Sequence, residues 1–353
     1  MISFLNLKPT AFGLDISDRS LKIIRLKKSS RSFELISSGE TIMKPGIIEQ
    51  GDIKNEKALS AAIKEAVKNV CGEKIRTKRV VISLPEEKTF LQVIQLPVMK
   101  EEEVQKAVYF EAENYIPLPI GKVYLDSQII SCDAKTNKLN VLIAAMPKTI
   151  VDSYVSALKG AALEPVVLEI ESMSIARALI KNNNADSRAL ILIDLGENRT
   201  NFSIFLDQSL KFTTTSQISA KNFSEIIAQS LKINSKEAEA LKIKHGIGNS
   251  KSGKKNAEIL NSALVDFIDL SQKYINYCQT QYNQKAIKIL LCGGGANLKG
   301  LPDFLHRQLK IPVERGNPWT NITFNSSKRA CLSDEESLKH TTAIGLALRG
   351  IQL

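Results

Sequence analysis

Short apolar runs separated by polar turns open the chain and predict an antiparallel sheet. Residues 12–14 are apolar up to Asp15, and two further apolar runs, 21–26 and 32–36, follow after polar turns. Runs of this length with turns between them are typical of strands that pair with their neighbours along the chain. Apolar residues at helical spacing over 58–70 then predict an amphipathic helix.

The same order of elements returns in the second half of the chain. An apolar run at 189–193 leads into Asp194, and after a polar turn come apolar runs at 201–205 and 210–214. A unit that occurs twice at this separation predicts two similar lobes, because solenoid repeats recur every 20–50 residues or so. Two lobes would form a cleft, which is a preferred place for a ligand.

Residues 78–165 have their own alternation of strand and helix patterns. Apolar runs at 80–84, 90–94 and 139–145 predict strands, and the patterns at 101–115 and 149–161 predict helices. We therefore predict an α/β fold in three parts. These parts are the first lobe (1–77), an inserted small α/β subdomain (78–165), and the remainder of the fold with the second lobe and a C-terminal helix (166–353).

Composition excludes several classes of protein. The 353 residues are 43% apolar and 24% charged, which excludes a disordered or fibrous chain. No apolar run reaches the roughly 18–20 residues that span a bilayer, and the N-terminus has no apolar stretch typical of a secretory signal. Five widely spaced cysteines without a CxxC pair predict free thiols, and three histidines give little material for a zinc site. We expect a cytoplasmic globular protein.

The formal net charge of +11 leaves three interpretations open. A solvated surface, contact with an anionic membrane or acidic partner, and nucleic-acid binding are all compatible with it. The lysines are scattered, apart from small clusters at 27–28 and 251–255, and no basic stretch is interleaved with aromatic residues. This distribution favours a solvated surface over a nucleic-acid site.

Asp15 and Asp194 each follow an apolar strand immediately before a turn. Two carboxylates facing one cleft can hold a hydrated Mg²⁺, which keeps several waters and needs only one or two carboxylates plus phosphate oxygens. The turns offer N–H groups to phosphates and Gly196 permits close approach, while Lys22 and Thr200 follow on the next strand of each hairpin. The alternative is that both are ordinary aspartates of β-hairpin turns.

Three consecutive glycines, Gly293, Gly294 and Gly295, follow the apolar run that ends at Cys292. Such a run permits a phosphate or a flat ligand to lie against bare backbone at a helix N-terminus. The pattern is neither GxxxxGK[ST] nor GxGxxG. A tight turn from strand to helix would use the same glycines, so both interpretations stay open.

Two acidic positions are further candidates. Glu239 and Lys242 are three residues apart on a predicted helix at 236–244 and share a face, as a surface ion pair also would. Glu171 lies on the amphipathic stretch 168–179. It is either a solvated helix residue or a carboxylate that reaches into the cleft to orient water.

Together these segments resemble the actin-type nucleotide-binding superfamily. Residues 15–22 are similar to its first phosphate segment, 194–200 to its second, and the three glycines to its adenosine segment. Glu239 and Lys242 resemble the pair that contacts the ribose, and 341–348 resembles the second connecting helix with Gly345 at its hinge. The resemblance implies a two-lobed actin-like (ribonuclease H-like) fold that binds ATP and Mg²⁺.

The inserted part resembles a narrower family, the type IV pilus assembly proteins PilM. This resemblance covers nearly the whole chain and implies a cytoplasmic, ATP-binding scaffold of the inner-membrane assembly complex, peripheral to that membrane, in pilus biogenesis and twitching motility. The implied partners are the cytoplasmic N-terminal segment of PilN and other inner-membrane pilus proteins, with no nucleic acid. The segments that carry the resemblance are 94–99, 101–103, 111–118, 123–128 and 311–318.

The resemblance also implies roles for individual residues. Asp15 and Asp194 would hold Mg²⁺ through water, and Glu171 would be the catalytic residue that orients water if hydrolysis occurs. The nucleotide would lie between the lobes, contacted further by Ser17, Lys22, Gly196, Thr200, Glu239, Lys242, Gly293, Gly294 and Gly295. Ser17 stands where the family has glycine, and its Cβ would crowd a phosphate on the backbone. We therefore expect at most a weak ATPase, with nucleotide as a structural or regulatory ligand.

Two other functions stay open. The cell-division protein FtsA shares the architecture and an insert in the same place, which would make the chain a membrane-associated filament protein. FtsA usually extends beyond the second connecting helix, whereas this chain ends at Leu353. An ATP-dependent small-molecule kinase on the same fold would need a base beside its acceptor hydroxyl and a second substrate pocket, and the insert offers no clear candidate for either.

Overall fold

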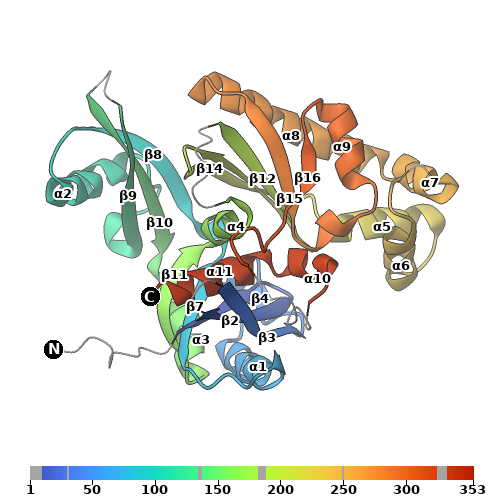
Figure 1. Cartoon of the computed structure of the whole chain (residues 1–353), viewed down its shortest axis with the longest axis horizontal. Helices are drawn as coiled ribbons and strands as arrows, with labels where there is room; N and C mark the ends of the chain where they lie inside the picture. The colour runs from blue at the N-terminus through green and yellow to red at the C-terminus, as the bar shows by residue number, and fades with distance from the viewer. Residues whose placement is uncertain (1–9, 30–31, 134–136, 182–187, 249, 324–331) are drawn as a thin grey trace. The chain divides into compact units, whose positions relative to one another are not determined.

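The computed structural model describes residues 10–353 apart from 30–31, 134–136, 182–187, 249 and 324–331 (Figure 1). The chain divides into two compact units. Unit 1 comprises Met1–Ile180, Pro318–Ser333 and Thr342–Leu353, and unit 2 comprises Lys181–Asn317 and Asp334–Thr341. Both units contain mixed sheets covered by helices, which confirms the predicted α/β class.

A six-stranded sheet forms the centre of unit 1. Its strands, in order across the sheet, are β11 (Glu164–Ile170), β7 (Arg79–Leu84), β1 (Phe12–Ile16), β2 (Ser20–Ser29), β3 (Ser32–Ile42) and β6 (Cys71–Gly72). The strands β1, β2 and β3 pair antiparallel in succession, as the sequence predicts, while β7 lies parallel to β1. A small hairpin of β4 (Ile48–Glu49) and β5 (Asp52–Ile53) follows β3.

Helices cover both faces of this sheet. On one face, α1 (Glu56–Lys68) and α3 (Lys148–Gly160) pack on Leu14 and Ile23, which point to the same side of their strands. On the other face, α4 (Glu171–Leu179) and α11 (Thr341–Ile351) pack around Ile24 and the single tryptophan, Trp319. Because side chains alternate between the faces of a strand, Ile23 and Ile24 enter different cores.

A separate three-stranded sheet belongs to unit 1. Its order is β8 (Phe90–Pro97), β10 (Lys138–Pro147) and β9 (Val123–Asp133), all antiparallel, with α2 (Glu101–Glu111) supplying Val104 and Val108 to its core. The strand β7 and the start of β11 lie within the predicted insert 78–165, and both strands pair with the six-stranded sheet. The α-helix predicted over 101–115 ends earlier, at Glu111, and a 3-10 helix over Ala112–Asn114 follows it.

Unit 2 repeats the pattern of unit 1. Its five strands, in order, are β14 (Ser209–Ser216), β13 (Thr200–Leu206), β12 (Ala189–Leu195), β15 (Ala286–Cys292) and β16 (Val313–Arg315). The strands β12, β13 and β14 pair antiparallel and β15 lies parallel to β12. The series β15-β12-β13-β14 therefore matches β7-β1-β2-β3, which confirms the predicted internal repeat.

Unit 2 packs its helices on an aromatic core. Phe202 of β13 contacts Phe267 and Tyr274 of α8 with ring centroids 5.8 and 5.1 Å apart. The helices are α5 (Ala220–Leu231), α6 (Ser235–His245), α7 (Lys251–Ile259), α8 (Asn261–Tyr282), α9 (Leu301–Leu309) and α10 (Asp334–Lys339). None of the helices in the described part of the chain combines the length and the apolar character that a bilayer crossing requires.

The cysteines that the structure describes are free thiols, as predicted: Cys71 and Cys132 are exposed, and Cys278 and Cys292 are buried. The fifth, Cys331, lies outside the described residues. Across the described ranges, no three His, Cys, Asp or Glu side chains gather as a metal site.

Candidate functional site

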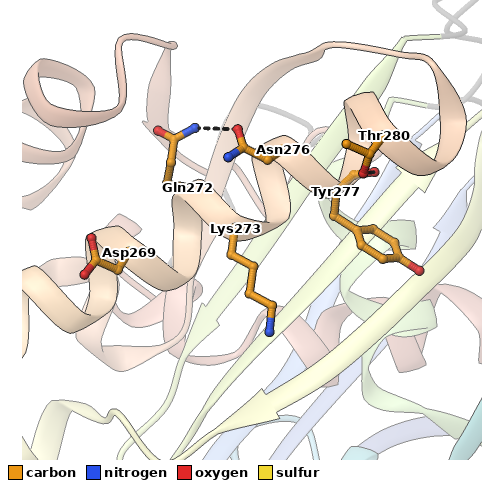
Figure 2. A pocket seen from close by; sticks show the side chains of 6 residues that line it. All are labelled: Asp269, Gln272, Lys273, Asn276, Tyr277 and Thr280. Carbon is orange, nitrogen blue, oxygen red and sulfur yellow. Dashed lines mark hydrogen bonds between the residues drawn. The ribbon is translucent and has the colours of Figure 1, made fainter.

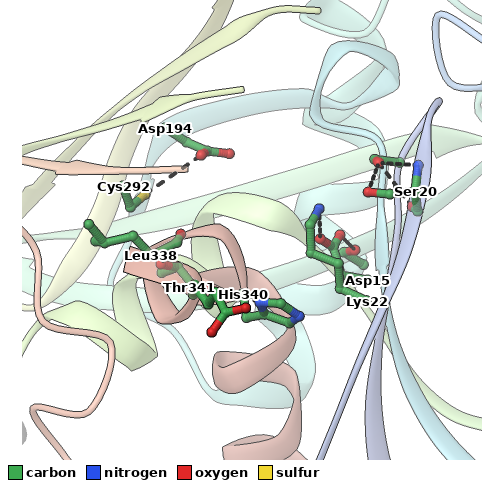
Figure 3. Close-up of polar contacts among 11 residues, drawn as sticks. Asp15, Ser20, Lys22, Asp194, Cys292, Leu338, His340 and Thr341 are labelled. Atoms are coloured by element: carbon green, nitrogen blue, oxygen red, sulfur yellow. Dashed lines mark hydrogen bonds and ion pairs between the residues drawn. The ribbon is translucent and has the colours of Figure 1, made fainter. Parts of the chain in front are cut away.

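Asp15 is a buried carboxylate with two defined partners, shown in Figure 3 among its neighbours. Lys22 lies opposite Asp15 in the β1–β2 register, and its Nζ is 3.5 Å from Asp15 Oδ2. Ser83, at the end of β7, donates its hydroxyl to Asp15 Oδ1 at 3.0 Å. The pairing of β1 with both neighbours thus fixes the carboxylate near the end of an interior strand, with the Lys22 ammonium beside it.

Ser17 closes the hairpin that follows Asp15. Its N–H donates to Ser20 O at 3.0 Å, its hydroxyl lies 3.0 Å from the same oxygen, and Ser20 N–H donates back to Ser17 Oγ at 3.2 Å. The Ser17 side chain is therefore folded onto its own turn. Serine commonly makes such local hydrogen bonds.

Glu171 is the first residue of α4, at the positive end of the helix dipole. The next residue, Ser172, donates both its N–H and its hydroxyl to the buried carboxylate of Glu86, at 3.0 and 2.9 Å. Glu86 thus holds the N-terminus of α4 in place and so fixes the position of Glu171.

Asp194 of unit 2 occupies the place that Asp15 has in unit 1. It pairs with Cys292 in the β12–β15 register, and Cys292 Sγ is 3.8 Å from Asp194 Oδ1 (Figure 3). Burial, together with the nearby Asp194 carboxylate, raises the pKa of the Cys292 thiol well above its usual value. The thiol is therefore protonated and donates to the carboxylate.

The glycine run packs against this strand end. Gly293 has φ +80°, and a Cβ there would lie 2.3 Å from Asp194 Oδ1. A Cβ on Gly295 would lie 2.4 Å from Leu195 Cγ. Gly294, by contrast, is exposed, and its Cβ would meet only Lys339 Cγ, at 3.7 Å. Two glycines are therefore required by packing, and the middle one leaves its backbone open.

The turn after Asp194 is tied to α5. Gly196 N–H donates to Arg199 O at 2.9 Å, and Gly196 O accepts from Ala220 N–H at 3.0 Å. Thr200 is fully buried and donates its hydroxyl to Ile218 O at 2.7 Å. Thr200 thus braces the turn from the inside.

Glu239 and Lys242 form a partly buried ion pair, with Lys242 Nζ 2.7 Å from Glu239 Oε2. The ammonium also donates to Ala220 O at 2.7 Å and to Ser224 Oγ at 2.8 Å, and Ser224 in turn donates to Glu239. The Lys242 side chain is 8% exposed and that of Glu239 46%. This is more than a surface ion pair, and through Ala220 it joins the turn at Gly196.

A shallow surface pocket of about 490 Å³ lies elsewhere in unit 2, along α8 (Figure 2). The side chains are polar or charged apart from one ring, and Gln272 donates to Asn276 at 3.0 Å. No sequence motif falls here. The lining residues are Asp269, Gln272, Lys273, Asn276, Tyr277 and Thr280.

Each unit thus assembles its own share of the predicted residues. Unit 1 connects Asp15 with Lys22 and fixes Glu171, and unit 2 connects Asp194, Gly196, Thr200, the glycine run and the Glu239–Lys242 pair. Sequence reasoning missed Ser83, Glu86 and Cys292. Ser83 alone had a visible signal, as the single polar residue of an otherwise apolar run at 80–84.

Comparison with known proteins identifies relatives over nearly the whole chain. A family model described as "Type IV pilus assembly protein PilM" matches residues 13–351. A solved structure, described as the PilM-PilN type IV pilus biogenesis complex, has a TM-score of 0.81 and 26% sequence identity. That similarity covers 97% of this chain and 99% of the other.

More distant relatives share the fold. MreB5 of Spiroplasma citri, solved bound to ADP, has a TM-score of 0.56 and 12% identity over 97% of this chain and 96% of its own. Cell division protein FtsA of Enterococcus hirae is 24% identical over 234 residues, which is 58% of this chain. The match covers 52% of that protein, so the chain spans about half the length of this curated relative. The predicted actin-like fold is confirmed by these neighbours.

Proposed function

Because the chain belongs to the type IV pilus assembly protein PilM family, we propose that it is an actin-like scaffold of the pilus inner-membrane assembly complex. We further propose that it binds the cytoplasmic N-terminal segment of a PilN-like protein and sits at the inner membrane through that partner. The observation that carries the proposal is the family match over 13–351, which includes the three-stranded sheet as well as both copies of the repeat. The family match and the similarity to the PilM-PilN complex favour the scaffold over the filament and kinase alternatives.

Exposed apolar side chains support a protein partner near the three-stranded sheet. Phe110 is 73% exposed, and it stacks edge-on against the half-exposed Tyr109. Exposed apolar side chains that gather on one surface mark interaction sites on soluble proteins. Among the residues that the structure describes, six of the ten exposed large apolar side chains fall between residues 98 and 129, which points to this part of unit 1. These six are Val98, Tyr109, Phe110, Tyr115, Tyr124 and Ile129.

We also propose that Mg-ATP is a ligand. The donor set fits the group: Asp15 and Asp194 are strand-end carboxylates, and Mg²⁺ accepts one or two carboxylates while keeping its waters. The bare backbone at Gly294 suits phosphate or adenosine. When bound, Mg-ATP supplies a cation and a phosphate chain, for which the two aspartate hairpins have the donors.

We assign each of these residues one role in binding Mg-ATP. Asp15 and Asp194 hold the metal through water. Lys22 and the turns at Ser17 and Gly196 face the phosphates, and Thr200 supports the turn at Gly196 from within. Gly293, Gly294 and Gly295 frame the adenosine, and Glu239 with Lys242 holds the ribose. Glu171 orients water if hydrolysis occurs. Nucleotide then acts as a regulatory ligand, and it transmits a signal only through differential affinity for two states.

Equilibrium binding of Mg-ATP tests the ligand. Asp15→Asn keeps the shape of the side chain and removes its charge, so we expect affinity to fall at least tenfold. Asp126→Asn, an exposed aspartate on β9, is the matched control and should bind as the unaltered chain does. Equal binding by Asp15→Asn, with a folded sample, would remove Asp15 from the site.

Titration with a synthetic peptide of the PilN N-terminal segment tests the partner. Phe110→Ser should weaken binding of the peptide. Ile243→Ser should not, although Ile243 in unit 2 is also apolar and is 59% exposed. Failure of the unaltered chain to bind the peptide at high micromolar concentration would reject the scaffold function as stated. An equal loss of peptide affinity in both variants would reject the exposed apolar residues near the three-stranded sheet as the binding surface.

A further inference from the structure

The tip of the Asp15 hairpin carries a second aspartate that is anchored elsewhere in unit 1. Asp18 accepts two backbone hydrogen bonds, from Gln50 N–H at 3.1 Å and from Gly51 N–H at 3.0 Å. A carboxylate that accepts two N–H groups is held in a defined position, because charge-assisted hydrogen bonds are short and directional. The hairpin is thus tied to the turn that joins β4 and β5.

That turn can take few other sequences. Gln50 and Gly51 both have positive φ, 50° and 75°, as in the two-residue hairpin turns that require left-handed backbone at both positions. A Cβ on Gly51 would lie 2.7 Å from Pro85 Cβ and 2.8 Å from Glu87 Oε1. The turn is therefore seated against the segment that also contains Glu86, the residue that fixes the N-terminus of α4.

Gly51 has a second partner on α3. Tyr154, 1% exposed, donates its hydroxyl to Gly51 O at 3.1 Å. Burial raises the pKa of Tyr154, and the negative charges of nearby carboxylates raise it further, so the phenol stays a donor. These carboxylates are Glu171, Asp18, Asp52 and Asp15. One peptide segment thus accepts from α3 through its carbonyl and donates to the hairpin tip through its N–H. The helix α3 continues directly from β10 of the three-stranded sheet.

We propose that Asp18, Gly51 and Tyr154 form a joint that positions the Asp15 hairpin for phosphate and couples it to α3 and the three-stranded sheet. None of the three residues needs to touch the nucleotide, so Tyr154 and Asp18 are positioning residues. The inference rests on the proposed function, since it assigns phosphate to this hairpin. Coupling between two binding sites is reciprocal. If a partner that shifts α3 changes the affinity for nucleotide by some factor, nucleotide changes the affinity for that partner by the same factor.

Tyr154→Phe tests the joint, since it removes one hydroxyl and keeps the ring. We expect Mg-ATP affinity to fall about three- to tenfold, the range for one lost buried hydrogen bond. Tyr282→Phe is the matched control, because Tyr282 also donates to a backbone carbonyl, that of Lys211, but in unit 2. Its affinity should stay within about twofold of the unaltered chain.

Two readouts separate a joint from general support of the fold. Asp18→Asn should also weaken Mg-ATP, and the double variant should lose less than the product of the two single losses, because both act through Gly51. Hydrogen exchange of the Gln50 and Gly51 amides should quicken in Asp18→Asn and in Tyr154→Phe, with no nucleotide present. A merely destabilised fold would quicken exchange across all of unit 1.

The outcomes decide the inference separately from the proposed function. Affinities unchanged in both variants, or losses that simply multiply, would overturn the joint. If the unaltered chain binds no Mg-ATP, the proposed ligand fails, and the exchange experiment alone then decides. Unchanged exchange at Gln50 and Gly51 in Tyr154→Phe would overturn the coupling, and faster exchange confined to the turn would support it.

Discussion

The crossing of α4 and α11 depends on one glycine, and replacing it should unfold unit 1 more easily. A Cβ on Gly345 would lie 1.9 Å from Ser174 O and 2.5 Å from Ser174 C. Both atoms are backbone of α4, so no side chain can turn aside. The helices would have to separate by about 1.5 Å to restore ordinary contact. Gly345 O also accepts from Arg177, whose guanidinium pairs with Glu169 at 2.8 Å, so separation strains that contact too.

The expected loss for Gly345→Ala combines two opposing terms. Overpacking a closed core, with the backbone shifts that it forces, typically costs about 1–3 kcal/mol. Alanine favours the helix by about 1 kcal/mol over glycine, which offsets part of the cost. The 1.9 Å approach to backbone places the cost at the upper end of that range, so we expect the free energy of unfolding to fall by about 2 kcal/mol. Gly121→Ala is the matched control, because nothing lies within 4 Å of its Cβ, and it should change stability by less than about 0.5 kcal/mol.

Trp319 makes this measurement specific to unit 1. It is the single tryptophan, is 5% exposed, and packs in the same core as Ile344 and Ala347 of α11. Urea unfolding followed by its fluorescence therefore reports the altered helix directly. If Gly345→Ala has the same urea midpoint as the unaltered chain, the packing argument is refuted. If Gly121→Ala shifts the midpoint as much as Gly345→Ala does, the effect comes from replacing glycine by alanine and not from this contact.

Three further predictions concern buried polar groups. Iodoacetamide should modify Cys71 and Cys132 in the native protein and spare Cys278 and Cys292 until denaturant is added, which peptide mass spectrometry would show; native labelling of Cys292 would contradict its burial. Burial raises the pKa of Cys278 to about 11 from 9.0. The unfolded thiol therefore ionises first, and Cys278 should lower stability between those pH values by up to about 1.4 kcal/mol per pH unit. In urea titrations the slope of stability against pH should be shallower by that amount in Cys278→Ala. Glu86→Gln should cost about 1–2 kcal/mol in the same assay, because Ser172 loses a charged acceptor; no loss would mean that α4 does not depend on this cap.

Local patterns were sufficient for most strands and helices. Apolar runs around Asp15 and Asp194 predicted both hairpins, and their repetition predicted the matching order of strands in the two units. The patterns succeeded because each strand pairs with its sequence neighbour, so short-range alternation carries the topology. The strand β7 has the same pattern as any other apolar strand, and only its pairing with β1 assigns it to the six-stranded sheet.

Contacts between distant segments could not be predicted from the sequence. Ser83 reaches Asp15 across a parallel pair, and Glu86 caps a helix that begins 85 residues later in the chain, at Glu171. Neither pair has a spacing that signals it. The same holds for Tyr154 and Gly51, which meet because α3 packs on the sheet beside the β4–β5 turn.

The glycine run shows how the structure separates two interpretations that the sequence left open. Gly293 and Gly295 are needed by the fold, because a Cβ at either would strike Asp194 or Leu195, so their replacement would unfold the protein and report nothing on a ligand. Gly294 is different, since its Cβ would find open space and only Lys339 in ordinary contact. Gly294→Ala should therefore leave the free energy of unfolding within about 0.5 kcal/mol. If adenosine or phosphate lies on this bare backbone, the same variant should weaken Mg-ATP at least several-fold in equilibrium binding. Unchanged affinity in Gly294→Ala, beside tight binding by the unaltered chain, would reduce the three glycines to a turn between strand and helix.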